Sequence, residues 1–217
     1  SNYTSCTEEY DGSSWSTGGA LGTALYSNSG IGTQNAALSA GGGNGSLTAC
    51  TFEYDGSSWS AGGDLQVARY NMAGGGTQDA AIVAGGGFYN QCCICTEEYN
   101  GTSWSNGGSL SQARYELAGA GTQNATLASG GVTNTQTNCT EEYDGTSWST
   151  ATGFSTTRRS IGGNGTQNAA LIFGGNANSN NSCTEEYNGS TWSTGGALQV
   201  GRCCSAGAGL QSAALAI

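Results

Sequence analysis

The amino-acid sequence predicts an all-β protein, and three observations carry this prediction. A ten-residue stretch, CTEEYDGSSW from Cys6 to Trp15, recurs four more times with few changes. Its tryptophan falls at positions 15, 59, 104, 148 and 192, so the period is 44 or 45 residues. Between the copies, short apolar runs alternate with glycine-rich turns, a pattern typical of short β-strands. A fixed period of this length indicates a repeat architecture.

Each unit is predicted to form four antiparallel strands. In the second unit, residues 25–33 form a first strand of small residues, and the apolar run in NAALSAGG (35–42) forms the second. The third strand is CTFEY (50–54), followed by Asp-Gly, a dipeptide typical of a two-residue hairpin turn. The fourth strand carries Trp59 and ends at a glycine pair. Four strands per unit of about 44 residues predict the blade of a β-propeller.

The order of the units predicts one domain, 1–217, that forms a five-bladed β-propeller. The first residues supply only two outer strands and the last residues only two inner strands, so together they would make one blade and close the ring. Tyr10 and Trp15 are large enough to fill the wedge between blades. The predicted blades are 24–63, 68–108, 113–152 and 157–196, with a closing blade made of 1–19 and 198–217.

The recurring signals of a unit stand in a fixed order. In the third unit they are Arg69, Tyr70, Gly74, Gly76, Ile82, Gly85, Gly86, Glu98, Tyr99, Gly101 and Trp104. This order resembles the kelch repeat. The resemblance covers the whole chain and is closest to the glycine- and threonine-rich kelch-like arrays encoded by bacteriophages of aquatic bacteria. It implies a propeller fold, although kelch propellers usually have six or seven blades.

The composition excludes several functions. The net charge is -10, from 15 acidic residues against five arginines and no lysine, which disfavours nucleic-acid binding. No apolar run approaches the roughly 20 residues that span a bilayer, and no targeting segment is present at the start, so we expect no membrane insertion. Nine cysteines without a histidine favour an extracellular or virion-associated protein.

The acidic pairs do not indicate an enzyme. Adjacent residues on a strand point to opposite faces, so the two carboxylates of a pair such as Glu97 and Glu98 do not converge on one substrate. We expect instead that one glutamate per blade pairs with the arginine that precedes the first strand (Arg69, Arg114, Arg158, Arg202), a pairing that the unit with Leu25 at this position tests. The Asp-Gly turns offer too few ligands for calcium, and no metal or cofactor is expected.

The cysteines are candidates for disulfides. Those that open the third strands occupy equivalent positions in different blades, too far apart to bridge one another. Local bridges from Cys92 or Cys93 to a third-strand cysteine, bridges from Cys203 or Cys204, buried free thiols and an intermolecular bond remain as alternatives. The complete set is Cys6, Cys50, Cys92, Cys93, Cys95, Cys139, Cys183, Cys203 and Cys204.

The units differ most in the loop between their second and third strands. By strand alternation, these loops share one face with the starts of the first strands. We therefore expect a non-catalytic structural or adhesive module, of a phage appendage or another extracellular assembly, that presents these loops to a structural protein or a cell-surface glycan. A homo-oligomer or larger assembly is compatible with this interpretation. The candidate binding residues are Asn44, Phe88, Tyr89, Asn90, Asn134, Gln136, Asn178 and Asn180.

A multivalent lectin is the alternative. In it, Trp and Tyr rings beside a recurring glutamine would form up to five sugar pockets between blades. Exposed tryptophan rings would favour this alternative, and buried rings would count against it. The glutamines are Gln34, Gln78, Gln123, Gln167 and Gln211.

Overall fold

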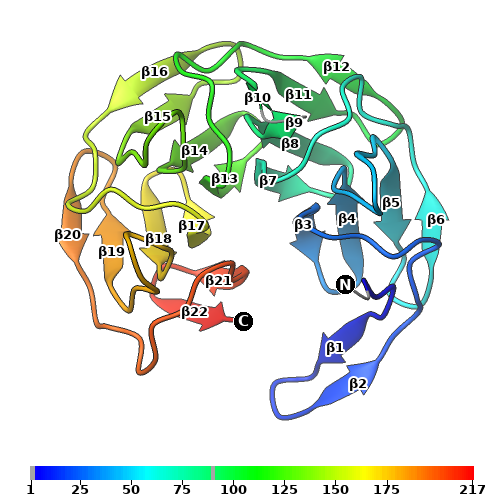
Figure 1. Cartoon of the computed structure of the whole chain (residues 1–217). Helices are drawn as coiled ribbons and strands as arrows, with labels where there is room; N and C mark the ends of the chain where they lie inside the picture. The colour runs from blue at the N-terminus through cyan, green and yellow to red at the C-terminus, as the bar shows by residue number, and fades with distance from the viewer. Residues whose placement is uncertain (1–2, 89–90) are drawn as a thin grey trace.

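A computed structural model describes residues 3–88 and 91–217 of the chain. These residues form β-strands and connecting turns, with no helix among them. Antiparallel sheets follow one another around a central axis, which is the arrangement of a β-propeller (Figure 1). The all-β prediction and the propeller arrangement are therefore confirmed.

Four of the sheets are complete blades of four strands, in which consecutive strands pair from the axis outward. The first blade contains β3 (Ser29–Thr33), β4 (Ala36–Ala40), β5 (Thr51–Tyr54) and β6 (Trp59–Ala61). The second contains β7 (Ala73–Thr77), β8 (Ala80–Ala84), β11 (Thr96–Tyr99) and β12 (Trp104–Asn106). The third and fourth contain β13 (Ala118–Thr122), β14 (Ala125–Ser129), β15 (Thr140–Tyr143), β16 (Trp148–Ala151), β17 (Gly162–Thr166), β18 (Ala169–Phe173), β19 (Thr184–Tyr187) and β20 (Trp192–Thr194).

The remaining units are half-blades. At the start of the chain, β1 (Glu8–Tyr10) pairs only with β2 (Trp15–Thr17), and at its end β21 (Gly207–Leu210) pairs only with β22 (Ala213–Ala216). The two half-blades lie at the two ends of an open ring (Figure 1). The structure thus has four complete blades where five were predicted, and the predicted pairing that closes the ring is not present among the described strands.

The turn between the third and fourth strands differs from the prediction. Tyr54 pairs with Trp59, which leaves four residues in the connection where the Asp-Gly pattern predicted two. The reason is the side chain of Asp55, whose Oδ1 accepts hydrogen bonds from the backbone amides of Ser57 and Ser58 at 2.9 and 2.8 Å. This local side-chain turn is a stable alternative to the two-residue hairpin.

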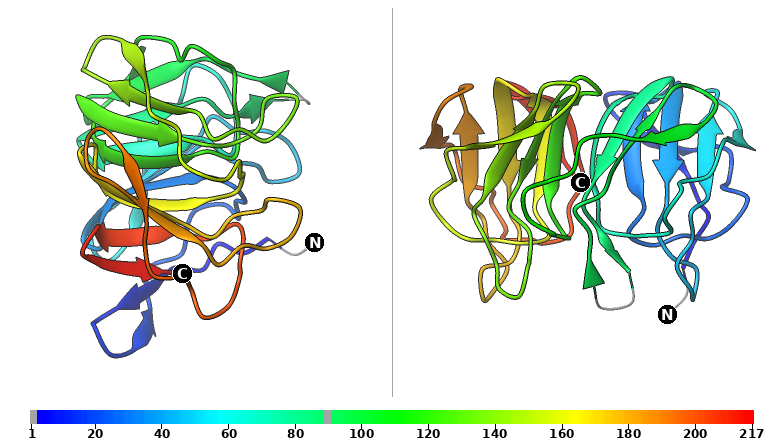
Figure 2. Two further views of the ribbon diagram at one scale, coloured as in Figure 1. Left: turned by 90° about the vertical axis from the view of Figure 1, so that its left-hand side faces the viewer. Right: turned by 90° about the horizontal axis from the view of Figure 1, so that it is seen from above.

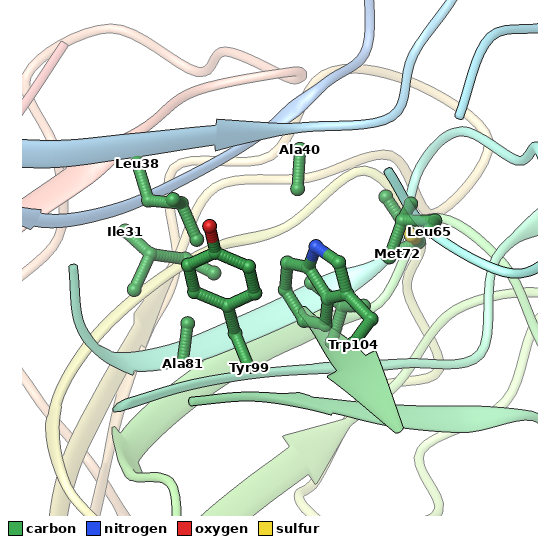
Figure 3. Close-up of a cluster of buried hydrophobic side chains, with 9 residues drawn as sticks. Ile31, Leu38, Ala40, Leu65, Met72, Ala81, Tyr99 and Trp104 are labelled. Carbon is green, nitrogen blue, oxygen red and sulfur yellow. The ribbon is translucent and has the colours of Figure 1, made fainter. Parts of the chain in front are cut away.

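The hydrophobic core lies between neighbouring blades. Tyr99 and Trp104, from β11 and β12, pack next to one another and face Ile31 and Leu38 of the preceding blade (Figure 3). Both aromatic side chains are buried, at 0% and 5% exposure. Full burial of one such side chain contributes about 1.5–3 kcal/mol, so these contacts are a major source of stability.

Glycine allows the innermost strands to approach one another at the axis. A Cβ atom on Gly119 of β13 would overlap the backbone carbonyl oxygen of Gly74 in β7. The expectation that small residues line the axis for steric reasons is confirmed at this contact.

Candidate functional site

The loops between the second and third strands lie beside the segments that enter the first strands. In the first blade, Tyr26 exchanges backbone hydrogen bonds with Gly43 at 2.9 and 3.0 Å, and Tyr115 does the same with Val132 in the third blade. Figure 2 shows these loops along one side of the ring. We call this side the loop face, as defined by residues 43–47, 87–88, 91–92, 132–136 and 176–180.

The loop face holds the predicted binding residues whose structure is described. Gln136 is half-buried, and Phe88 ends the short strand β9 (Gly87–Phe88), which pairs with β10 (Gln91–Cys92). Tyr89 and Asn90 lie outside the described residues. The others are exposed: Asn44, Asn134, Asn178 and Asn180.

A second group of variable residues surrounds the axis and was not predicted. One residue just before the first strand of each unit has a positive φ, between 51° and 60°. In the last four units, the backbone amide of this residue donates to the backbone carbonyl of its counterpart in the preceding unit, at 2.9 to 3.0 Å. In chain order these residues are Ser27, Asn71, Glu116, Ser160 and Cys204.

These axial residues line a cavity of about 600 Å³ to which all five units contribute. Its lining includes apolar side chains such as Met72 and Ile161. The carboxylate of Glu116 accepts a hydrogen bond from the Ser160 hydroxyl at 2.6 Å and lies 3.6 Å from the Arg159 guanidinium. Because the axial residues precede the first strands, the mouth of this cavity belongs to the loop face. Because the residue at this position differs among the copies, it gave no signal in the sequence.

The predicted pairing of arginine with glutamate is confirmed in three blades. Arg114 Nη2 donates to Glu141 Oε1 at 2.8 Å, and both side chains are 0% exposed. Burial lowers the pKa of the corresponding Arg69, and the nearby Glu97 carboxylate partly opposes this effect. The other pairs are Arg69–Glu97 and Arg158–Glu185, at 3.0 and 2.6 Å.

The glutamate directly before the recurring tyrosine contacts the following unit in the first four copies of the motif, at Glu9, Glu53, Glu98 and Glu142. Tyr99 donates its hydroxyl proton to Glu53 at 2.5 Å, and Tyr187 donates to Glu142 at 2.7 Å. The two carboxylates of one pair therefore serve different contacts, one within a blade and one between blades.

The recurring tryptophans and glutamines also connect blades. Trp104 Nε1 donates to Thr51 Oγ1 at 2.9 Å, and its ring is buried. Gln78 Nε2 donates to the backbone carbonyls of Ala37 and Tyr54 at 3.0 and 2.7 Å, and Gln123, Gln167 and Gln211 make the equivalent pairs of bonds. These groups are occupied by contacts between blades, whereas Trp15 and Gln34, near the start of the chain, are exposed.

One of the candidate local bridges is present, because Cys93 and Cys95 form a disulfide. The other seven cysteines are free in the part of the chain that the structure describes. Among them, Cys203 and Cys204 are sequence neighbours whose sulfur atoms lie 3.3 Å apart at the axial end of the last unit. Over the same described residues, no cluster of three or more His, Cys, Asp or Glu side chains has the arrangement of a metal site.

Fold and site together define a β-propeller-like repeat protein. A comparison with protein-family models found no match, and a comparison with curated protein sequences found no significant similarity. The described residues contain no helix that is long and apolar enough to cross a membrane.

Proposed function

We propose that this chain is a non-catalytic structural or adhesive module, a five-bladed propeller of the kelch type, that presents its loop face to a partner outside the cell. The phage-encoded kelch-like arrays that the sequence resembles make a virion appendage the natural setting. The partner is a structural protein of the same assembly or a component of a cell surface. Several similar faces in one ring suit contact in which modest affinities combine.

One observation carries this proposal: the residues that recur in every unit are used for packing, and those that differ gather on the loop face. Tyr99, Trp104 and Gln78 each bind a neighbouring blade, as described above. Asn44 and Asn134, in contrast, are exposed at loop tips whose sequences are different in each unit. Exposed, variable loops on a rigid scaffold are the usual location of binding residues.

Sugar pockets between the blades receive no support from these contacts. The tryptophan ring that would stack on a sugar is buried at Trp104 and half-buried at Trp59, Trp148 and Trp192. Among the five it is exposed at Trp15 alone, in the first half-blade. The amides of Gln78 and Gln123 already donate to backbone carbonyls. A glycan remains a candidate partner for the loop face itself.

The experiment compares two triple variants with the unmodified protein. The loop-face variant carries Asn44→Lys, Asn134→Lys and Asn180→Lys, and the control variant carries Asn35→Lys, Asn124→Lys and Asn168→Lys in the exposed turns between first and second strands, at the opposite end of the blades. Each adds the same three positive charges to a chain of net charge -10. Binding of the labelled proteins is measured on intact aquatic bacteria and on an array of glycans.

We expect the loop-face variant to lose at least about tenfold in affinity, which corresponds to 1.4 kcal/mol, while the control variant retains binding. Binding to bacterial cells without binding to glycans identifies a protein partner. Equal loss in both variants would refute a specific loop face. Retention of binding by the loop-face variant would place the contact elsewhere on the ring.

A further inference from the structure

We infer that the open edge of β22 accepts the β1–β2 hairpin of the same molecule, and that a buried ion pair between Arg202 and Glu8 fixes this contact. The inference rests on the five-bladed architecture of the proposed function and adds the residues that select the partner of the open edge.

The complete blades follow a pairing rule. Where a unit has arginine at the position of Arg114, ahead of its first strand, the first glutamate of its third strand faces this arginine, as Glu141 faces Arg114. The second oxygen of that glutamate accepts a hydrogen bond from the backbone amide of Ser111 at 2.8 Å. In the first blade both positions change together, to Leu25 and Phe52. Arginine and glutamate are therefore present as a pair or absent as a pair.

The two half-blades each contain one member of such a pair. Arg202 precedes β21 and is placed like the other arginines, since its backbone carbonyl accepts a hydrogen bond from Gly175 at 2.9 Å, as that of Arg114 does from Gly86 at 2.8 Å. Glu8 occupies in β1 the position of Glu141 in β15. Both are exposed, and neither takes part in an ion pair within the described residues.

The register of the contact follows from the complete blades. In the first blade, Ala37 pairs with Tyr54 and Leu38 pairs with Glu53. In the two half-blades, Ala214 and Leu215 are equivalent to Ala37 and Leu38, and Tyr10 and Glu9 are equivalent to Tyr54 and Glu53. The same register therefore places Ala214 opposite Tyr10 and Leu215 opposite Glu9. Ala216 then lies opposite Glu8, and the amide of Gln199 takes the role that Ser111 has toward Glu141.

Other groups at the two ends lack the contacts that their equivalents make. Gln34 is exposed, whereas Gln78 donates to two carbonyls of the preceding blade. The inferred contact gives Gln34 the carbonyls of Ala214 and Tyr10. Trp15 is 48% exposed, and the contact brings its indole nitrogen to Thr184.

The positions of the half-blades favour a contact within one molecule. The hairpin already packs on the first blade, where Trp59 Nε1 donates to Thr7 Oγ1 at 2.9 Å. At the other end, Gln211 donates to Ala170 and Tyr187 of the fourth blade at 2.9 and 2.8 Å. Ser27 and Cys204, from the two ends, line the same axial cavity. Both half-blades thus flank the position of one fifth blade.

The test is a double-mutant cycle that uses the pair found in the first blade. Glu8→Phe, Arg202→Leu and the double variant are compared with the unmodified full-length protein by thermal unfolding and by mass measurement in solution. We expect each single change to lower Tm by about 5–10 °C, because it leaves one buried charge unpaired, and the double variant to recover most of the loss. Glu9→Phe combined with Arg202→Leu is the matched control and should give no recovery.

Hydrogen exchange of 213–217 separates this inference from the architecture on which it rests. Protection of these amides in a monomer, together with the coupled Tm values, supports the inference. Protection without coupling overturns the ion pair and leaves a closed ring. Coupling in a dimer overturns the contact within one molecule and identifies the hairpin of a second copy as the partner. Unprotected amides with additive changes of Tm overturn both the contact and the five-bladed ring.

Discussion

Arg114 and Glu141 form an ion pair in the interior of a blade, where water reaches neither side chain. The guanidinium also donates to the carbonyls of Gly130 and Cys139, at 2.8 and 2.9 Å, which connects the second strand to the third. Its Nε has no partner, so the group is not fully satisfied. A buried ion pair of this kind gives little net stability but penalises the loss of either partner.

Replacement of one member of this pair should therefore destabilise the protein far more than replacement of both. We expect Arg114→Leu alone, or Glu141→Phe alone, to lower the free energy of unfolding by about 3–5 kcal/mol. The double variant reproduces the residues of the first blade and should recover at least half of this loss. Urea unfolding of the four proteins measures the coupling, and additive losses would contradict it.

The stability should fall as pH rises above 10. Burial, together with the hydrogen bond to Glu53, raises the pKa of Tyr99 to about 12, and burial with the bond to Glu98 raises that of Tyr143 to about 12. An unfolded tyrosine titrates near 10. Because the folded values are higher, this contribution is complete below pH 10 and is lost as pH rises toward 12.

Thermal unfolding between pH 8 and 11.5 measures this loss. Tyr143→Phe should be less stable at neutral pH, because Glu98 loses its donor, and should show a shallower decline at alkaline pH. Tyr3→Phe is the control, since Tyr3 is exposed. An identical alkaline decline in all three proteins would assign the effect to other groups.

Asparagine should replace aspartate in the four-residue turns without loss. Asp144 Oδ1 accepts hydrogen bonds from the amides of Thr146 and Ser147, both at 2.8 Å. Asn100 makes the same contacts in another unit, at 3.0 and 2.9 Å. We expect Asp144→Asn to leave Tm unchanged at pH 7 and Asp144→Ala to lower it by a few degrees. A large loss in the asparagine variant would mean that the charge itself is needed.

The disulfide between Cys93 and Cys95 should contribute little to stability, because the loop that it closes is very short. Threonine takes the position of Cys93 in three other units, where Thr4, Thr48 and Thr137 accept hydrogen bonds from the cysteine amide at 3.1, 3.0 and 3.1 Å. Cys93→Thr should therefore fold with a similar Tm. Alkylation after unfolding should modify seven cysteines without reductant and nine with it, and any other count would contradict the assignment.

Much of the fold follows from the sequence because the same signals occur five times. The glycine pairs, the Glu-Tyr segments and the spacing of the tryptophans predicted four strands per unit and the contact between arginine and glutamate. The four-residue turn at Asp55 was not predicted, since its form depends on whether the carboxylate reaches the following amides. That is a choice between two local geometries of similar energy.

The open ring and the axial residues were harder to predict for different reasons. Strand pairing within a unit is local, whereas the predicted closure would pair Glu8 with a segment at the other end of the chain, and no local pattern reports on whether the two ends meet. Glu116 and its counterparts differ in chemical type, so they share no recognisable motif. What they share is a positive φ, which the sequence marks only where glycine is used.

The contacts between blades have a consequence for the number of copies. Four units present a glutamate to a tyrosine of the unit that follows, as Glu53 with Tyr99 illustrates. At three of these junctions a threonine also meets the following tryptophan, as Thr51 meets Trp104, whereas Trp192 donates to the backbone carbonyl of Thr152 instead. The junctions are therefore chemically alike. A unit inserted in frame would find on both sides the side chains with which it forms these hydrogen bonds. The number of units in the chain is therefore limited by the space around the propeller axis and not by the chemistry of the contacts.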